Sequence, residues 1–325
     1  MTVRPIDTRP RAATAWNSGW RVAGGLLRLA KIKVFQHYFG WALAWLMLSP
    51  EALRRPGTTS AMLLFLVGSA AIVACACSAD DIAGFRNGSD AMNYSAGERL
   101  RDIRAKPLLS GTVTERQAFA FSIAAGAVAV AAGLAAFWQL RWQAPVIAYV
   151  LYLAGFAAAV QYSAGFKISY HRGGAEVLLC LTTAAGLLAP FLAVNRSWSP
   201  SALVVALLLG LWLVMVSSCS NVNDAAGDGA AGRRTLAVSS SQTMLTAVMV
   251  TFFVVSVGLI VALTFSGPRW PWWTPLTALP AIVVHAGQLA TGPGRGRWLE
   301  ARRLGLIAYN LGFVGIGVPA YVAFH

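Results

Sequence analysis

Two acidic segments stand out in a chain that has few charged residues. The first, SADDIAGFRNGSDAMNY, covers residues 78–94, and the second, NVNDAAGDGAAGRRTL, covers residues 221–236. Each directly follows a long apolar stretch, and carboxylates at the edge of a membrane are costly unless they hold a cation or take part in chemistry. These two segments are therefore the first place to look for a functional site.

The spacing within the second segment indicates a cation site. Asp224 and Asp228 are four residues apart, so on a helix their carboxylates project from one face and repel each other unless a cation lies between them. Carboxylate oxygens suit Mg²⁺, which proteins commonly hold with one or two carboxylates and the phosphates of a substrate. We therefore expect a magnesium site that involves this pair.

The first segment needs a break in its helix to bring its acids together. Asp80 and Asp90 are ten residues apart, which puts them about 80° out of phase on a continuous helix. Gly84 and Gly88 could interrupt the helix between them, because glycine readily leaves the helical conformation. On the second helical piece, Asn87 and Asp90 would then share one face.

Basic residues accompany both acidic segments. They are Arg99, Arg101, Arg104 and Lys106 after the first segment, Lys167 and Arg172 in a later loop, and Arg233 and Arg234 within the second segment. A purely acidic cup would favour calcium binding or cation transport, whereas this mixture favours a pocket for a phosphate and a metal. For the three arginines at 99, 101 and 104, contact with phosphate and a role in membrane topology remain open alternatives.

The composition identifies the elements that must position these residues. Hydrophobic residues make up 57% of the chain and charged residues only 12%, whereas soluble domains carry about 25% charged residues. The sequence therefore predicts an all-α, polytopic membrane protein. Nine apolar stretches are long enough to cross a bilayer: 34–50, 60–78, 117–138, 144–163, 175–195, 202–220, 243–266, 270–290 and 304–324.

The distribution of Lys and Arg predicts how these nine helices are oriented. If the N-terminus is cytoplasmic, the cytoplasmic segments contain 21 of the 26 basic residues, as the excess of positive charge on that side of membranes requires. Both acidic segments then lie on the cytoplasmic face, and the C-terminus lies on the other. In a bacterium this membrane would be the cell membrane.

The N-terminal residues 1–33 are expected to form a cytosolic tail and an interfacial segment. Their polar start lacks the apolar core of a cleavable signal peptide. The net charge of +14 is explained by membrane topology and by attraction to anionic lipids. Membrane lipids are thus expected partners, and nucleic-acid binding has no support.

Four ordered motifs resemble the UbiA superfamily of intramembrane prenyltransferases. Besides the first acidic segment they are KPLLSG at 106–111, YSAGFKISYHRGG at 162–174 and DAAGDGAAGRRTL at 224–236. The resemblance implies a single transmembrane prenyltransferase domain over 34–325, with its helices around a central cavity. The Asp-rich motifs at 80–94 and 221–236 would cap this cavity on the cytoplasmic face.

The resemblance also implies a reaction. An isoprenyl diphosphate would bind through Mg²⁺, its carbon–oxygen bond would ionise, and a lipophilic or aromatic acceptor would capture the resulting allylic cation. Metal and basic side chains would stabilise the departing diphosphate, while a dry cavity would protect the cation from water.

The motifs assign roles to individual residues by resemblance. The implied metal ligands are Asp80, Asp81, Asp90, Asp224 and Asp228, and the last four of these form the catalytic set together with Tyr162. The implied substrate-binding residues are Lys106, Lys167, Arg172, Arg233, Asn87 and Asn221. The first motif departs from the pattern N-D-x-x-D-x-x-x-D, because it reads A-D-D-I-A-G-F-R-N and has Gly84 where an acid is expected.

Two other functions remain open at this stage. An intramembrane terpene cyclase on the same scaffold would ionise the same diphosphate but quench the cation with a double bond of the same chain or with water. A cation transporter is a more remote alternative. Such a protein should place ionisable groups near the middle of the bilayer on broken helices, whereas the acids of this chain follow the ends of the predicted helices.

Overall fold

The computed structural model describes residues 15–95, 101–266 and 270–325 of the chain. Within these ranges its regular secondary structure is helical, apart from one isolated bridge between Ser95 and Asp102. This confirms the predicted all-α class. Residues 1–14 of the expected N-terminal tail lie outside the described residues, as does Arg99.

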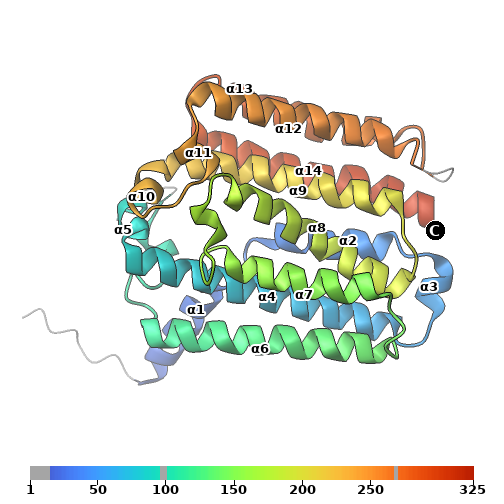
Figure 1. The fold of residues 1–325 in the computed structure, drawn as a ribbon, viewed down its shortest axis with the longest axis horizontal. Helices are drawn as coiled ribbons and strands as arrows, with labels where there is room; N and C mark the ends of the chain where they lie inside the picture. Colours follow the sequence, from blue (N-terminus) through green and yellow to red (C-terminus); the bar gives the residue numbers. More distant parts are fainter. Residues whose placement is uncertain (1–14, 96–100, 267–269) are drawn as a thin grey trace, which may run out of the picture.

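Six helices are long and apolar enough to cross a membrane, which supports an integral membrane protein. They are α4 (Thr58–Asn87), α6 (Glu115–Gln139), α8 (Gly174–Asn195), α9 (Pro200–Asn223), α12 (Gln242–Leu263) and α14 (Trp298–Phe324). Two shorter helices, α7 (Val146–Gln161) and α13 (Thr274–Thr291), run alongside them (Figure 1).

The count of nine transmembrane helices stays a prediction. The first stretch, predicted over 34–50, is not one continuous helix but a 3-10 turn, η1 (Phe35–Tyr38), followed by the eight residues of α2 (Phe39–Leu46). A short helix, α3 (Pro50–Arg54), follows and leads into α4.

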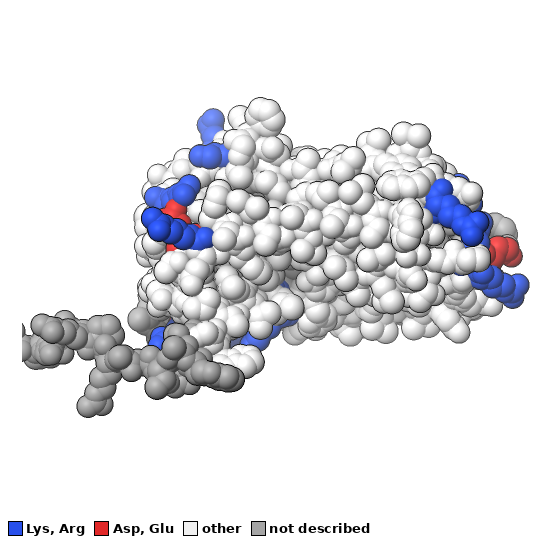
Figure 2. Space-filling model, turned by 90° about the horizontal axis from the view of Figure 1, so that it is seen from below, with Lys and Arg blue, Asp and Glu red and all other residues white. Residues whose placement is uncertain are grey.

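The short elements gather at the two ends of the bundle. Figure 1 shows α5 (Ser89–Asn93), α10 (Ala225–Ala230), α11 (Leu236–Ser239) and the N-terminal helix α1 (Ala15–Leu29) at one end, and α3 with the C-terminus at the other. Figure 2 shows Lys, Arg, Asp and Glu at both ends of the visible face, with a broad uncharged band between them. Such a band is what a bilayer requires of the surface that it covers.

The helix of the first acidic segment breaks at one of the two predicted glycines. Gly84 stays helical within α4, so the expectation that it interrupts the helix is wrong. The break comes at Gly88, whose φ of 80° lies in the left-handed region that glycine adopts without strain. The chain then turns into α5, which carries Asp90.

The main core fills the end of the bundle far from the acidic segments. It combines the first turns of α4 with the last turns of α6 and α8 and the first half of α9. Its largest fully buried side chains include Phe65, Phe191 and Trp212. The cavity described below extends from the acidic end of the bundle to this core, because Phe65 and Tyr152 belong to both.

Candidate active site

The two acidic segments, 78–94 and 221–236, meet in space although they are far apart in the sequence. Arg233 Nη2 lies 2.6 Å from Asp80 Oδ1 at the end of α4, and Arg233 Nη1 lies 3.9 Å from Asp228 Oδ1 on α10. One guanidinium thus contacts both segments. Ser163 also donates a hydrogen bond to Asp80 Oδ1, over 2.6 Å.

A second set of contacts holds the segments together. The guanidinium of Arg101 donates to the hydroxyl of Tyr94 and to Asp224 Oδ2, each over 2.8 Å. The backbones of α5 and α10 are also close, because a Cβ added to Gly227 would collide with the carboxamide of Asn93. The two segments therefore form one site.

Lys106 lies between two carboxylates of the first segment. Its Nζ is 2.8 Å from Asp81 Oδ1 and 2.8 Å from Asp90 Oδ1, and all three side chains are buried. Burial lowers the pKa of Lys106, but the two carboxylates outweigh it and hold this pKa well above its usual value. The two acids therefore converge on a point that a positive charge can occupy.

Gly84 makes the position of Asp90 possible. A Cβ added to this glycine would lie 2.7 Å from Asp90 Cγ, closer than real Cβ atoms come to other atoms. The carboxylate delivered by α5 thus lies over the bare backbone of α4, at the position where the related pattern places an acid. Asp90 occupies the space that a side chain at Gly84 would fill.

The carboxylates of the second segment are buried and incompletely paired. Burial raises the pKa of Asp224, and it raises the pKa of Asp228 to about 6 although Arg233 opposes the shift. Asp224 Oδ1 is buried without a hydrogen-bond partner. A buried carboxylate oxygen without a partner is costly, and a cation would satisfy it.

The donor set fits a magnesium ion that a substrate helps to hold. Among the described residues, no group of three or more His, Cys, Asp or Glu side chains is arranged to hold a metal alone. The acids instead stand in small sets beside Lys and Arg. Mg²⁺ commonly takes one or two carboxylates and completes its shell with water and phosphate oxygens, so the site has the right donors for a metal–diphosphate pair.

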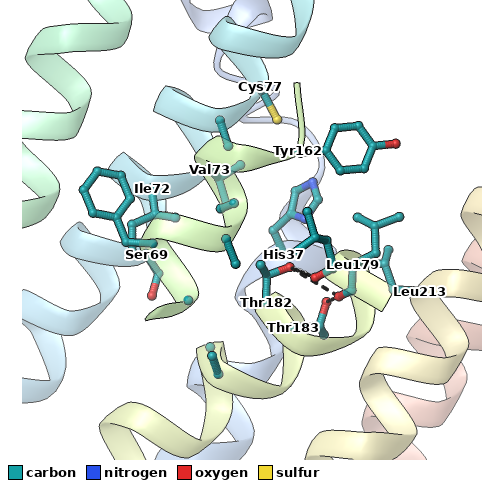
Figure 3. Close-up of a pocket in the computed structure, with 18 of the residues that line it drawn as sticks. His37, Ser69, Ile72, Val73, Cys77, Tyr162, Leu179, Thr182, Thr183 and Leu213 are labelled. Carbon is teal, nitrogen blue, oxygen red and sulfur yellow. Dashed lines mark hydrogen bonds between the residues drawn. The ribbon is translucent and has the colours of Figure 1, made fainter. Parts of the chain in front are cut away.

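An apolar cavity of about 320 Å³ lies beneath this site. It is lined mainly by α4, α7 and α8, and Asp80, Lys31 and Tyr162 line it too, at its acidic end. Figure 3 shows Tyr162 and Cys77 on one side and Thr182 and Thr183 on the other. Both threonine hydroxyls donate to backbone carbonyls of their own helix, so the wall that they form offers little free polarity.

Three of the predicted substrate-binding residues lie at the rim with exposed side chains. Asn87 donates to the hydroxyl of Tyr170, and its own oxygen accepts from the backbone of Ser89. Lys167 lies with its Nζ 5.4 Å from the ring centre of Tyr170, and Arg172 is exposed as well. Their roles remain predictions.

Asn221 is buried but is engaged elsewhere. Its amide donates to Glu176 Oε1 over 3.1 Å, and the backbone of Leu236 donates to the same oxygen over 3.1 Å. Glu176 thus ties the first turn of α8 to the last turn of α9 and to α11. It positions the second acidic segment, a role that its sequence context did not indicate.

Other members of the site were missed because no local pattern marks them. Lys31 Nζ lies 3.9 Å from Asp81 Oδ1, although the sequence placed this lysine in a tail and interfacial segment. Tyr94 lies beneath two cations, with Lys106 Nζ and Arg101 Cζ each 5.1 Å from its ring centre. For Arg101 the sequence left contact with phosphate and a role in membrane topology as alternatives. Its contact with Asp224 becomes visible only in the fold.

Three solved structures share the fold of this chain. A UbiA homologue from Archaeoglobus fulgidus bound to DMAPP and Mg²⁺ is 14% identical, with a TM-score of 0.64, and the match covers 90% of this chain and 99% of that one. A digeranylgeranylglyceryl phosphate synthase is 15% identical, with a TM-score of 0.64 and coverage of 92% and 99%. A UbiA homologue from Aeropyrum pernix K1 is 16% identical, with a TM-score of 0.62 and coverage of 91% and 98%.

Sequence comparison gives the family independently of the fold. No curated protein matches the chain significantly. A model of the UbiA prenyltransferase family, however, matches residues 38–307, which contain all four motifs and both acidic segments. The chain therefore belongs to the UbiA prenyltransferase family.

Proposed function

We propose that the protein transfers an isoprenyl group from an isoprenyl diphosphate to a lipophilic or aromatic acceptor within the membrane, with Mg²⁺ as cofactor. The observation that carries this proposal is the convergence of two acidic segments and several cations at the mouth of an apolar cavity. Related structures that contain DMAPP or GPP together with Mg²⁺ support the substrate class.

The metal ligands in this proposal are the acids of the two segments. Asp81 and Asp90 would hold Mg²⁺ on one side and Asp224 and Asp228 on the other, with Asp80 in support. A metal held by these acids would supply positive charge to the departing diphosphate.

The basic residues of the site bind and orient the diphosphate. Arg233, Lys106 and Arg101 are buried beside the acids, where each can donate charge-assisted hydrogen bonds to phosphate oxygens. In water-excluded surroundings such contacts strengthen as negative charge develops on the leaving group.

The cavity accommodates the hydrocarbon chain and protects the reacting carbon. Tyr162 lines its acidic end, and the ring centre of Tyr162 lies 6.0 Å from Arg233 Cζ. The face of this ring can stabilise the positive charge that forms when the carbon–oxygen bond breaks. The apolar walls exclude water, so the acceptor rather than water captures the cation.

We extend the proposal to membrane topology. The acidic site lies at the same end of the bundle as α1 and the basic loops, which supports a cytoplasmic N-terminus and a cytoplasmic active site. We also propose a single domain over 34–325 with nine crossings, in which the segment formed by η1, α2 and α3, together with α7 and α13, supplements the six long helices.

The test uses purified full-length protein, Mg²⁺ and farnesyl diphosphate with a radiolabelled chain, with and without a lipid extract that supplies acceptors. We expect the label to appear in a larger lipophilic product only when the extract is present, with release of diphosphate. A labelled cyclic hydrocarbon formed without acceptor would instead establish the terpene cyclase. No release of diphosphate under either condition would overturn the proposal.

Replacing Lys106 with Met should raise the apparent KM for the diphosphate about tenfold, because one charge-assisted contact in the bound state is lost. Initial rates at varied diphosphate concentration would measure this change. The exposed Lys33, replaced with Met, is the matched control and should leave KM unchanged. An unchanged KM in the Lys106 variant would contradict its role in binding.

A further inference from the structure

The cavity has a measurable depth along the helices that line it. Asp80 and Phe65 both line it and are fifteen residues apart on α4, which corresponds to about 22 Å. Tyr162 and Tyr152 both line it and are ten residues apart along α7 and its C-cap, which corresponds to about 15 Å. The cavity is therefore a deep pocket with its closed end at Phe65 and Tyr152.

An aromatic cluster closes this end. The ring of Phe65 packs edge-on against that of Phe137, with 5.3 Å between centroids, and lies 5.8 Å from that of Tyr152. Phe65 is 1% exposed and belongs to the main core, which continues beyond it to the other end of the bundle. A chain entering from the acidic end therefore stops at this cluster.

Tyr152 fixes the closed end in place. Its hydroxyl donates to the carbonyl of Ala129 on α6 over 2.7 Å. Its ring fits against Gly68 on α4 and Gly133 on α6, where any added Cβ would collide with it. A side chain held by a hydrogen bond and by two glycine contacts cannot swing aside without disrupting three helices, so the floor is rigid.

We infer that this floor, with Phe65 as its surface and Tyr152 as its support, limits the donor to a hydrocarbon chain of three to four isoprene units. Each unit adds four bonded carbons, or about 5 Å, to an extended chain. A depth of about 15 to 22 Å thus matches farnesyl and geranylgeranyl diphosphate. The inference rests on the proposed function, because it takes the diphosphate to lie at the acidic end.

Chain-length preference can be measured by binding alone. Radiolabelled farnesyl diphosphate, bound to the purified protein with Mg²⁺ and no acceptor, would be displaced by unlabelled dimethylallyl, geranyl, farnesyl, geranylgeranyl and geranylfarnesyl diphosphates. We expect the farnesyl and geranylgeranyl compounds to compete at least about tenfold better than the geranyl and geranylfarnesyl compounds. Equal competition by all lengths, or best competition by geranyl diphosphate, would overturn the inference.

Replacement of Phe65 with Ala tests the floor itself. It should shift the preference by one isoprene unit, so that geranylfarnesyl diphosphate competes as well as geranylgeranyl diphosphate does in the wild type. Phe191 on α8 is equally buried but does not line the cavity, so its replacement with Ala should keep the wild-type order. If the Phe65→Ala variant does not fold, Phe65→Leu replaces it and should shift the order in the same direction.

The outcomes separate the two proposals. If labelled farnesyl diphosphate binds but neither Phe65 variant changes the order of competition, the inference about the floor fails and the proposed function stands. If the labelled compound does not bind with Mg²⁺ at all, the proposed function fails, and the inference fails with it.

Discussion

Replacing Asp228 with Asn should reduce the rate of isoprenyl transfer by about two to three orders of magnitude, because the variant loses a charged group that stabilises the departing diphosphate through the metal. Asp228 is buried on α10 beside Arg233, at the end of the bundle far from the main core. The fold should therefore survive. Single-turnover rates with saturating labelled diphosphate would measure the loss, and the thermal unfolding midpoint would show that the protein is intact.

Asp102 provides a control for the Asp228 variant. It lies near the same end of the bundle, but its carboxylate pairs with the exposed Arg104 and not with the site. Its replacement with Asn should change the rate by less than about twofold, as is usual for exposed ion pairs. Full activity of the Asp228 variant would remove the second acidic segment from the mechanism.

The second large effect should come from moving one carboxylate between α5 and α4. Asp90→Ala removes a carboxylate from the first segment and should cost about two orders of magnitude in rate. Gly84→Asp, added to that variant, returns a carboxylate to the space that Asp90 fills in the wild type. The double variant should transfer the isoprenyl group at least about tenfold faster than Asp90→Ala.

Binding of Mn²⁺ with a diphosphate, followed by electron paramagnetic resonance, gives a readout that does not depend on turnover. It should weaken in Asp90→Ala and recover in the double variant. Gly84→Ala in the wild-type background is the matched control, since its Cβ would displace the carboxylate of Asp90 without supplying another. A double variant no better than Asp90→Ala would show that the two positions are not equivalent.

The sequence predicted the parts of the fold that depend on local pattern. Apolar stretches predicted the long helices α4 and α6 to within a few residues at their outer ends, because hydropathy over a bilayer's length is a strong signal. The stretch at 34–50 misled, because its aromatic and apolar residues pack as a 3-10 turn and a short helix. Hydropathy alone does not register such a break.

The behaviour of Gly84 has a physical reason. Glycine lowers helix stability, and on that ground the sequence suggested two breaks in the first acidic segment. Only Gly88 takes a left-handed conformation. A helix that continues through Gly84 keeps its backbone groups hydrogen-bonded, and the missing side chain there leaves the space that Asp90 fills.

The candidate site was predicted in outline but not in its pairing. The acids at 80, 81, 90, 224 and 228 were identified as a group and lie together. Which cation contacts which acid depends on tertiary structure, so the bridge formed by Lys106 and the contribution of Lys31 were beyond the reach of spacing arguments. The exposed position of Lys167 likewise depends on how the loop before α8 folds.

The ion pairs of the site should make the binding of Mg²⁺ and the binding of the diphosphate depend on each other. Five acids face four cations there, namely Lys31, Arg101, Lys106 and Arg233, so the charges largely cancel. A lone metal ion would have to compete with a lysine or an arginine, and a lone diphosphate with carboxylates. Together they replace both sets of partners, which makes their binding cooperative, with each ligand raising the affinity of the other by the same factor. Titration calorimetry of the diphosphate with and without Mg²⁺ would measure that factor, and a value near one would exclude the coupling.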